Sequence, residues 1–302
     1  MKDGASPFRF SAGVTLTALL VAAARAIETR HPQGMIKDPY AEAFVRAAET
    51  PVLLPVSIEE VPDGDDDPVW GRGGQYFALR TRVFDDFLQD AAHHDGIRQL
   101  VLLGAGLDTR ALRLDWPPGT TVFEVDRCDL FDFKQDVLTA AGARPAVPYR
   151  FVAADLETNW ARKLREAGFD PRQPSAWVIE GVIPYLPASV ERDLLATVSA
   201  LSAEGSVIGY EILRGQETDE IRNNSLYADT EEKVGVHLGG LFSGDARPDS
   251  AAALTAAGWE MSGESVYGFT RRYGRGPHPG VDDAISHARW LRGRRVRVPR
   301  TD

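Results

Sequence analysis

The chain has 302 residues, enough for one large domain with a sizeable core, and its 43% hydrophobic and 26% charged residues are ordinary for a soluble globular protein. Its net charge of −10 argues against a nucleic-acid backbone or an anionic membrane as the main partner. Cys128 is the one cysteine, which excludes an internal disulfide and a cysteine zinc cluster and fits a reducing, cytoplasmic setting.

The first part of the chain, residues 1–95, is predicted to form an N-terminal helical cap. Apolar residues recur at helical spacing from Leu16 to Ile27, with Arg25 and Glu28 on the other side. Basic residues before this stretch resemble the start of a secretory signal, but the helical pattern favours an amphipathic helix of the cap. No run is long enough to span a bilayer. The helices predicted in the cap cover residues 15–30, 38–49 and 73–94.

From residue 98 onward, short apolar runs alternate with helical stretches. Strands separated by helical crossovers make a parallel sheet covered on both faces, so we predict an α/β core over residues 96–275. The predicted strands are QLVLLG (99–104), TTVFEVD (120–126), YRFVAAD (149–155), AWVIEG (176–181) and SVIGYEI (206–212). The predicted helical stretches between them cover residues 108–114, 128–141, 156–167 and 187–202.

The end of the core is less regular. An insert of low periodicity at about 214–249 is predicted to form a lid. A helix over 250–257 and two strands, around 259–261 and 265–272, are expected to complete the domain. Residues 276–302 are predicted to be a C-terminal tail, and its basic run is either a solvated terminus, which we favour, or a phosphate-binding arm.

A glycine turn follows the first predicted strand, at the sheet edge where open α/β folds bind ligands. Gly104 permits a tight turn, and Gly106 leaves room for a ligand. Asp126 lies 20 residues beyond Gly106 at the next strand end, with Glu124 two residues before it. A carboxylate there can accept two hydrogen bonds from a ribose diol. The pattern predicts an adenosine site; the alternative is a plain strand–helix turn.

Two residues after the turn argue against a phosphate in this site. Thr109 stands where a dinucleotide fingerprint has its third glycine, and Asp108 would repel a phosphate at the start of the helix. We therefore expect a phosphate-free adenosine such as S-adenosylmethionine (SAM), a sulfonium with an amino-acid tail. The alternatives are an NAD-dependent oxidoreductase and a SAM-binding protein without catalysis.

Arg80 shares a helical stripe with Phe77, Phe84 and Phe87 and so points inward. A guanidinium on an inward face needs an anion beside it. Either the carboxylate of a ligand or an internal Asp or Glu can supply that anion.

An ordered set of motifs resembles the leucine carboxyl methyltransferase family. The central motifs are GAGLDTR, FEVD, AADL and EGVIPYL; TALLVAAARAIETR and KDPYAEAF come before them, and RRYGR comes after them. The resemblance covers roughly residues 11–275. It implies a class I methyltransferase (Rossmann-like) fold: a seven-stranded, mostly parallel sheet with helices on both faces and an N-terminal helical cap. It also implies SAM as the cofactor, with S-adenosyl-L-homocysteine as the product.

The resemblance further implies which residues contact the cofactor, without showing whether Glu124 or Asp126 binds the ribose diol. The implied contacts are Arg80 at the SAM carboxylate, Gly104, Ala105 and Gly106 under the methionine part, Glu124 and Asp126 near the ribose, Asp155 and Leu156 beside the adenine, and Glu180 and Gly181 against the methionine tail. For the acidic residues among them, capping of the following helix is the alternative role.

Methyl transfer from a sulfonium is an in-line displacement, in which a phenol, alcohol or indole acceptor uses a base and a carboxylate does not. Tyr227 and His237, both in the insert, are the candidate catalytic residues, as a base or an orienting group. The candidate walls of an apolar acceptor pocket are Tyr76, Tyr185 and Phe242, together with Trp70. The same aromatics can equally be core residues. Phe8 and Phe10 are candidates for a lid.

We expect the acceptor to be a small aromatic or indole-containing secondary metabolite, as in antibiotic biosynthesis, methylated on oxygen or carbon. The family's other branch suggests the alternative of carboxyl methylation at a protein or peptide C-terminus. The six histidines show no metal-ligand spacing, so we expect no metal. We expect a cytoplasmic monomer or homodimer.

Overall fold

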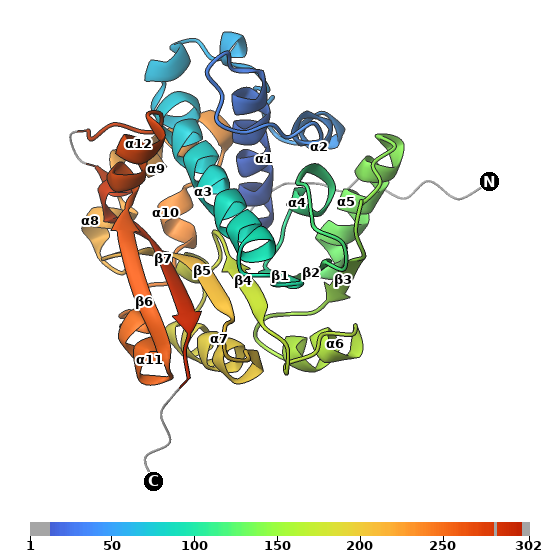
Figure 1. Cartoon of the computed structure of the whole chain (residues 1–302). Coiled ribbons are helices and arrows are strands. Elements are labelled where there is room, and N and C mark those ends of the chain that lie inside the picture. Colours follow the sequence, from blue (N-terminus) through green and yellow to red (C-terminus); the bar gives the residue numbers. More distant parts are fainter. Residues whose placement is uncertain (1–12, 281–282, 298–302) are drawn as a thin grey trace.

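The computed structural model describes residues 13–280 and 283–297 (Figure 1). Within these residues, seven strands form one sheet in the order β3-β2-β1-β4-β5-β7-β6. The first five strands are parallel, and β7 runs antiparallel to both of its neighbours. The order reverses between β1 and β4, which places a crevice beyond their carboxyl ends. The strands are β1 (Gln99–Leu103), β2 (Thr121–Asp126), β3 (Tyr149–Ala153), β4 (Ser175–Ile179), β5 (Val207–Leu213), β6 (Trp259–Ser265) and β7 (Ala288–Arg295).

The helices cover both faces of this sheet, as Figure 1 shows. In the first half of the chain they are α1 (Val14–Arg30), α2 (Ala41–Ala47), α3 (Gly74–His93), α4 (Arg110–Arg113), α5 (Cys128–Ala140) and α6 (Trp160–Glu166). In the second half they are α7 (Ala188–Leu201), α8 (Asp219–Arg222), α9 (Ser225–Val234), α10 (Leu238–Leu241), α11 (Ser250–Ala256) and α12 (Val266–Tyr273). Shorter helical turns are η1 (Ile58–Glu60), η2 (Gly64–Asp66), η3 (Pro68–Gly73), η4 (Ile183–Tyr185) and η5 (Ala284–His287).

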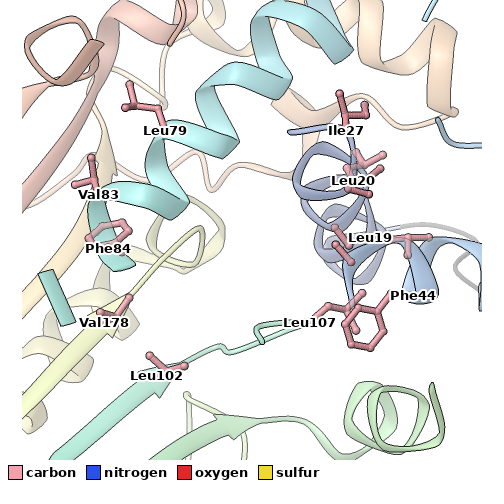
Figure 2. Packing of buried hydrophobic residues seen from close by; sticks show 14 of the residues in the cluster. Leu19, Leu20, Ile27, Phe44, Leu79, Val83, Phe84, Leu102, Leu107 and Val178 are labelled. Carbon is pink, nitrogen blue, oxygen red and sulfur yellow. The ribbon is translucent and has the colours of Figure 1, made fainter. Parts of the chain in front are cut away.

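The buried side chains of the central strands β1 and β4 alternate between two hydrophobic clusters, one on each face of the sheet. In β1, Leu100 and Leu102 join a cluster with α1, α2, α3, α5 and α12, whereas Val101 and Leu103 join a cluster with α6, α7 and α11. This alternation is what a strand buried on both faces requires. Figure 2 shows part of the first cluster, with labelled side chains from α1, α2, α3, the loop after β1 and the sheet: Leu19, Leu20, Ile27, Phe44, Leu79, Val83, Phe84, Leu107, Leu102 and Val178.

The cap helix α1 is buried on almost every side, which differs from the amphipathic helix that we expected. Arg25 and Glu28 are both buried, at 6% and 3% exposure. Arg25 lies 2.9 Å from a carboxylate oxygen of Asp38 and donates to the carbonyl of Leu107 at 2.6 Å. Glu28 pairs with Arg275 at 3.2 Å. These pairs let two charged side chains face the interior, where the sequence pattern alone predicted solvent.

The expected strand at 265–272 is wrong, because these residues form α12. The hydroxyl of Ser265 accepts a hydrogen bond from the Gly268 N–H and caps the helix, and Gly274 ends it in the left-handed conformation with φ of 71°. Val266 and Phe269 are buried at helical spacing. The cap and the terminal glycine were both visible in the sequence.

The last strand of the sheet, β7, comes from the segment that we expected to be a solvated basic tail. It lies between β5 and β6, inside the sheet. Its arginines cover aromatic rings: the Arg292 guanidinium lies 5.7 Å from the ring centroid of Phe87, and that of Arg295 lies 5.8 Å from Trp259. Stacked guanidinium groups of this kind allow a strand rich in arginine to pack against the protein.

The insert over residues 214–249 is also more regular than expected. It contains α8, α9 and α10, and its buried residues Ile221, Tyr227, Val234 and Leu238 join the cluster on the α1 and α3 side of the sheet. Of the helices that the structure describes, none is long and apolar enough to cross a membrane.

Candidate active site

A cavity of about 320 Å³ opens beyond the carboxyl ends of β1, β2 and β4, with α1 on its other side. It is where a doubly wound sheet is expected to bind a ligand. The structure places these predicted cofactor-binding residues in its wall: Arg80, Gly104, Ala105, Gly106, Asp126, Asp155, Leu156, Glu180 and Gly181.

The glycine turn forms one side of this cavity and adopts a backbone conformation that favours glycine. Gly104 and Gly106 have φ values of 69° and 52°. A Cβ atom on Gly104 would lie only 2.4 Å from Cγ2 of Val182, whereas one on Gly106 would lie 3.4 Å from Cβ of Ala18. A side chain at position 104 would therefore clash with Val182, whereas one at position 106 would make an ordinary contact with Ala18.

Asp126 faces the cavity and is tied to the glycine turn. Its Oδ2 accepts a hydrogen bond from the Gly106 N–H at 2.6 Å, and its Oδ1 accepts one from the Arg127 N–H at 2.7 Å. Burial raises the pKa of Asp126, and these two hydrogen bonds oppose the increase. Each carboxylate oxygen keeps a second lone pair for a ligand hydroxyl.

Glu124 is not in the cavity wall, whereas Asp126 is, so of the two acids between which the sequence left the ribose contact open, the cavity favours Asp126. Glu124 lies two residues earlier on the same face of β2 and is therefore deeper in the protein. Its Oε2 accepts hydrogen bonds from Lys134 Nζ at 2.5 Å and from the Tyr149 hydroxyl at 2.7 Å. Burial raises the pKa of Glu124 to about 7, although Lys134 opposes the increase.

Asp155 and Leu156 follow β3 at the far end of the cavity. The exposed carboxylate of Asp155 accepts the Glu157 N–H at 2.8 Å, within its own loop. α6 begins later, at Trp160, after Asn159. Asp155 therefore closes a local turn rather than capping the helix, and it remains open to the cavity.

Arg80 is 5% exposed and has internal carboxylate partners. Its Nε lies 2.9 Å from Oε1 of Glu180, and its Nη1 lies 2.7 Å from Oε2 of Glu211. An internal pair was one of the two roles predicted for this arginine. The same side chain borders the cavity, so the other role, binding a ligand carboxylate, remains a proposal.

Arg80 belongs to a buried ionic network of three arginines and four carboxylates among the described residues: Arg80, Arg110, Arg113, Asp85, Asp108, Glu180 and Glu211. Arg110 lies 2.8 Å from Oε2 of Glu180 and 2.7 Å from Asp85. Burial alone would raise the pKa of Glu180, but the charges of Arg110 and Arg80 outweigh it and lower that pKa. When all four carboxylates are ionised, the network has one negative charge more than it has positive charges.

Asp108 is part of this network, which changes the argument against a phosphate. Its carboxylate pairs with Arg110 and also accepts the Arg110 backbone N–H at 2.7 Å. Its charge is therefore already compensated. Asp108 and Glu180 both line the cavity, but arginines compensate the two carboxylates. The lining acids that have no arginine side-chain partner among the described residues, Asp126, Asp155 and Glu157, now carry that argument. They suit ribose hydroxyls and an adenine amine better than a pyrophosphate.

A second, mostly apolar cavity of about 100 Å³ adjoins the first and shares Arg80, Gly181 and Tyr185 with it. The structure brings together in its wall the aromatic residues expected around an acceptor: Trp70, Tyr76, Tyr185 and Phe242. The Phe242 ring centroid lies 5.7 Å from that of Tyr185 and 5.1 Å from that of Tyr227.

The two candidate catalytic residues have different positions. Tyr227 lines the second cavity, and burial raises its pKa well above the ordinary value, so its phenol stays protonated and cannot be a base at neutral pH. His237 lines neither cavity, so its expected action on the acceptor stays a prediction that the cavities do not support. Its Nε2 lies 2.9 Å from the carbonyl oxygen of Arg222, and its Nδ1 lies 3.5 Å from Glu231. Phe8 and Phe10 lie outside the described residues.

The sequence analysis missed two charged residues of this region. Glu211 lies near the end of β5 and lines the second cavity, and Arg110 links Glu180 to Asp85. Glu211 carries the signal that marked Asp126 and Glu180, an acid near the end of a buried strand, so it was detectable. Within residues 13–280 and 283–297, no group of three or more His, Cys, Asp or Glu side chains is arranged to hold a metal ion.

Comparison with solved structures identifies the fold. A methyltransferase structure from Thermobifida fusca matches with a TM-score of 0.52 and 17% identity, over 95% of this chain and 97% of that one. The strand order and the acid-lined cavity beside a glycine turn are those of a class I SAM-dependent methyltransferase. The sequence model of the leucine carboxyl methyltransferase family matches residues 18–199, and the chain belongs to this family.

Bacterial relatives carry a methyltransferase activity in their names. A Streptomyces coelicolor protein named as a SAM-dependent methyltransferase is 47% identical over 94% of both chains. One from Saccharopolyspora erythraea, with the same name, is 42% identical over 86% of this chain and 89% of its own. The chain is therefore a SAM-dependent enzyme, and the expected alternative of an NAD-dependent oxidoreductase is set aside.

Proposed function

We propose that this enzyme transfers a methyl group from SAM to a small, mostly apolar acceptor, an aromatic or indole-containing secondary metabolite that binds in the second cavity. The observation that carries the proposal is the apolar cavity itself, which meets the cofactor cavity at Arg80, Gly181 and Tyr185. Aromatic walls beside a charged boundary are typical of sites for small aromatic ligands. The cavity volume is of the order of one aromatic ring, so a larger acceptor requires the wall to move.

For the cofactor, we propose that Asp126 accepts the ribose hydroxyls and that Asp155 and Leu156 hold the adenine. Arg80 and Glu180 then hold the amino-acid end, with Gly181 beside it. Two features support this placement of SAM. The cavity wall contains the acids and glycines named above, and the cavity extends along the carboxyl ends of the strands from β3 to β4. Bound SAM supplies an electrophilic methyl group on a sulfonium; the protein orients the two reactants and excludes water.

The same geometry disfavours a carboxylate acceptor such as a peptide C-terminus. Among the described residues that line the second cavity, Arg80 is the cation, and it already has Glu180 and Glu211 as partners. SAM brings an ammonium group that balances its own carboxylate at Arg80, whereas a peptide C-terminus would bring a carboxylate with no cation left to pair with it. We therefore propose oxygen or ring carbon as the methylated atom. Tyr227 serves as a hydrogen-bond donor that orients the acceptor.

The test is incubation with isotopically labelled SAM and two sets of acceptors, small phenols and indoles in one and peptides ending in leucine in the other. Mass spectrometry should find the label in the small aromatics. Label transferred to the peptides alone would refute the proposal.

A matched pair of variants on α9 links this activity to the cavity. Thr230→Met fills the second cavity, whereas Ala228→Met adds the same side chain at an exposed position. We expect Thr230→Met to raise the acceptor KM or abolish turnover while S-adenosylhomocysteine affinity, measured by calorimetry, stays unchanged. Ala228→Met should resemble the parent in both assays. Equal activity of the two variants would place the acceptor elsewhere.

A further inference from the structure

Glu211 lies where the acceptor cavity meets the ionic network. It is the fifth residue of β5, and its side chain is 4% exposed. Its Oε2 is fully engaged, because it accepts Arg80 Nη1 at 2.7 Å and the Gly181 N–H at 3.1 Å. These two contacts fix the carboxylate at the boundary between the cavities.

The other oxygen, Oε1, has spare capacity. Its hydrogen bond is a long one, 3.4 Å from the indole Nε1 of Trp290, the cross-strand neighbour of Glu211 on β7. A carboxylate oxygen can accept two hydrogen bonds, and an N–H donor at 3.4 Å satisfies little of that capacity. Glu211 lines a cavity with mostly apolar walls, so its carboxylate is the strongest acceptor in that wall, and Oε1 is the oxygen with capacity left for a ligand.

The charged and titratable groups around Glu211 come from five elements or loops. They are Arg80 on α3, Glu180 after β4, Tyr185 on η4, Tyr227 on α9 and Trp290, a neutral donor, on β7. The phenols remain protonated, because burial raises the pKa of both tyrosines. Arg80 is shared with Glu180, so Glu211 does not have a cation to itself.

We propose that Glu211 selects a protic acceptor: Oε1 accepts the hydrogen of the acceptor's hydroxyl or ring N–H and takes that proton during methyl transfer. This inference rests on the proposed function and specifies its substrate class. For a hydroxyl acceptor, the bond from the methyl carbon to sulfur breaks and the bond to the acceptor oxygen forms. Sulfur keeps the electron pair of the broken bond. The hydroxyl proton passes to Glu211, which releases it to water after product leaves.

The protonation state of Glu211 suits this role. Burial raises the pKa of Glu211 to about 7, and the hydrogen bonds from Trp290 and Gly181 oppose the increase. A general base works best when its pKa lies near the operating pH. The carboxylate form increases as the pH rises through 7, so recognition of a hydrogen-bond donor should strengthen over the same range. A glutamate that only supports Arg80 would not change ligand preference with pH.

The experiment measures binding of three single-ring probes to the full chain saturated with S-adenosylhomocysteine. Phenol offers a donor, toluene has the same shape without one, and benzoate carries a charge. Calorimetry at about pH 8 should show phenol binding at least about tenfold more tightly than toluene, as a hydrogen bond to a charged acceptor implies. Benzoate should bind more weakly than toluene. The preference for phenol should decrease toward about pH 6.

Two variants complete the test. In Glu211→Gln, toluene affinity should be unchanged, the phenol preference should fall to about threefold or less at every pH, and benzoate should bind more tightly than to the parent. Glu191→Gln is the matched control, because Glu191 is also a buried glutamate paired with an arginine, Arg247, but lines neither cavity. It should behave as the parent does.

Each other outcome has a defined meaning. Equal binding of phenol and toluene to the parent, or a phenol preference that does not change with pH, overturns the role of Glu211 and leaves the aromatic cavity intact. Loss of the preference in both glutamine variants also overturns it. If none of the probes binds to the parent at millimolar concentration, both this inference and the proposed aromatic acceptor fail. Retained toluene and S-adenosylhomocysteine binding shows that a variant is folded.

Discussion

Gly104→Ala tests whether the turn after β1 is limited by the backbone conformation alone or also by contact with its neighbour. At φ of 69°, an L-residue costs about 1–2 kcal/mol relative to glycine. The added Cβ would lie 2.4 Å from Cγ2 of Val182, and overpacking of this kind typically costs about 1–3 kcal/mol more. We therefore expect Gly104→Ala to lower the free energy of unfolding by about 2–5 kcal/mol.

Two companion variants separate these contributions. Gly106→Ala has the same backbone problem at φ of 52°, but its Cβ would meet Ala18 at an ordinary 3.4 Å, so it should cost only about 1–2 kcal/mol. Val182→Ala removes Cγ2, the atom that the Cβ added in Gly104→Ala would clash with. The double variant Gly104→Ala/Val182→Ala should therefore recover about 1–3 kcal/mol relative to the sum of the single changes.

The assay is equilibrium unfolding in urea at neutral pH, with the slope of each transition checked against the parent. Additive effects within about 0.5 kcal/mol would show that the contact with Val182 contributes nothing and would refute the steric argument. Equal losses for Gly104→Ala and Gly106→Ala would refute it as well.

Three further predictions follow from the buried charges. Arg80→Met leaves Glu211 without its cation and should cost about 3–5 kcal/mol in urea unfolding. Burial raises the pKa of Glu211 to about 7, above its ordinary value, so ionisation of this carboxyl lowers the stability of the native state as the pH rises toward 7. The cost of Arg80→Met should therefore be larger at about pH 8, where the stranded carboxyl is ionised, than at about pH 6, where it is protonated. Asp126→Asn should weaken adenosine binding about tenfold or more in calorimetry, and unchanged affinity would remove Asp126 from the nucleoside site. Tyr149→Phe removes a donor from Glu124 and should cost about 1–2 kcal/mol. Because burial raises the pKa of Glu124 to about 7, its ionisation lowers the stability of the native state as the pH rises toward 7. The hydrogen bond from Tyr149 lowers this pKa, so its loss should extend the decrease in stability to higher pH. An unchanged pH profile would contradict this.

The parallel part of the sheet was predictable because its strands are short apolar runs that end in glycine or acid. β1 to β5 all lie where the sequence placed them. Period-2 alternation was not needed, since both faces are covered and the runs are mostly apolar, with Glu124, Arg150 and Glu211 as charged exceptions. The glycine turn and the strand-end acid Asp126 were predictable for the same reason: parallel strands bring their carboxyl ends to one edge.

In the antiparallel part, the strand expected around 259–261 corresponds to the start of β6, but β7 was not predicted, because its sequence signals conflict. β7 carries arginines that resemble a solvated tail. In the fold, Arg292 and Arg295 lie over the rings of Phe87 and Trp259, and Arg294 pairs with Asp95 at 2.5 Å. The partners in buried ion pairs could not be predicted from the sequence either. Sequence spacing showed that Arg80 faces inward, but only the fold shows that Glu211, 131 positions later, meets it.

The position of β7 also constrains how the protein matures on the ribosome. β6 is made before β7, yet its sole partner strand among the described residues is β7, as the order β5-β7-β6 requires. Until residues 288–295 emerge and pair with both strands, the backbone groups on the facing edges of β5 and β6 therefore have no strand to bond with. Trp290 arrives with the same strand, so Glu211 in the wall of the second cavity gains its indole neighbour only when β7 takes its place in the sheet.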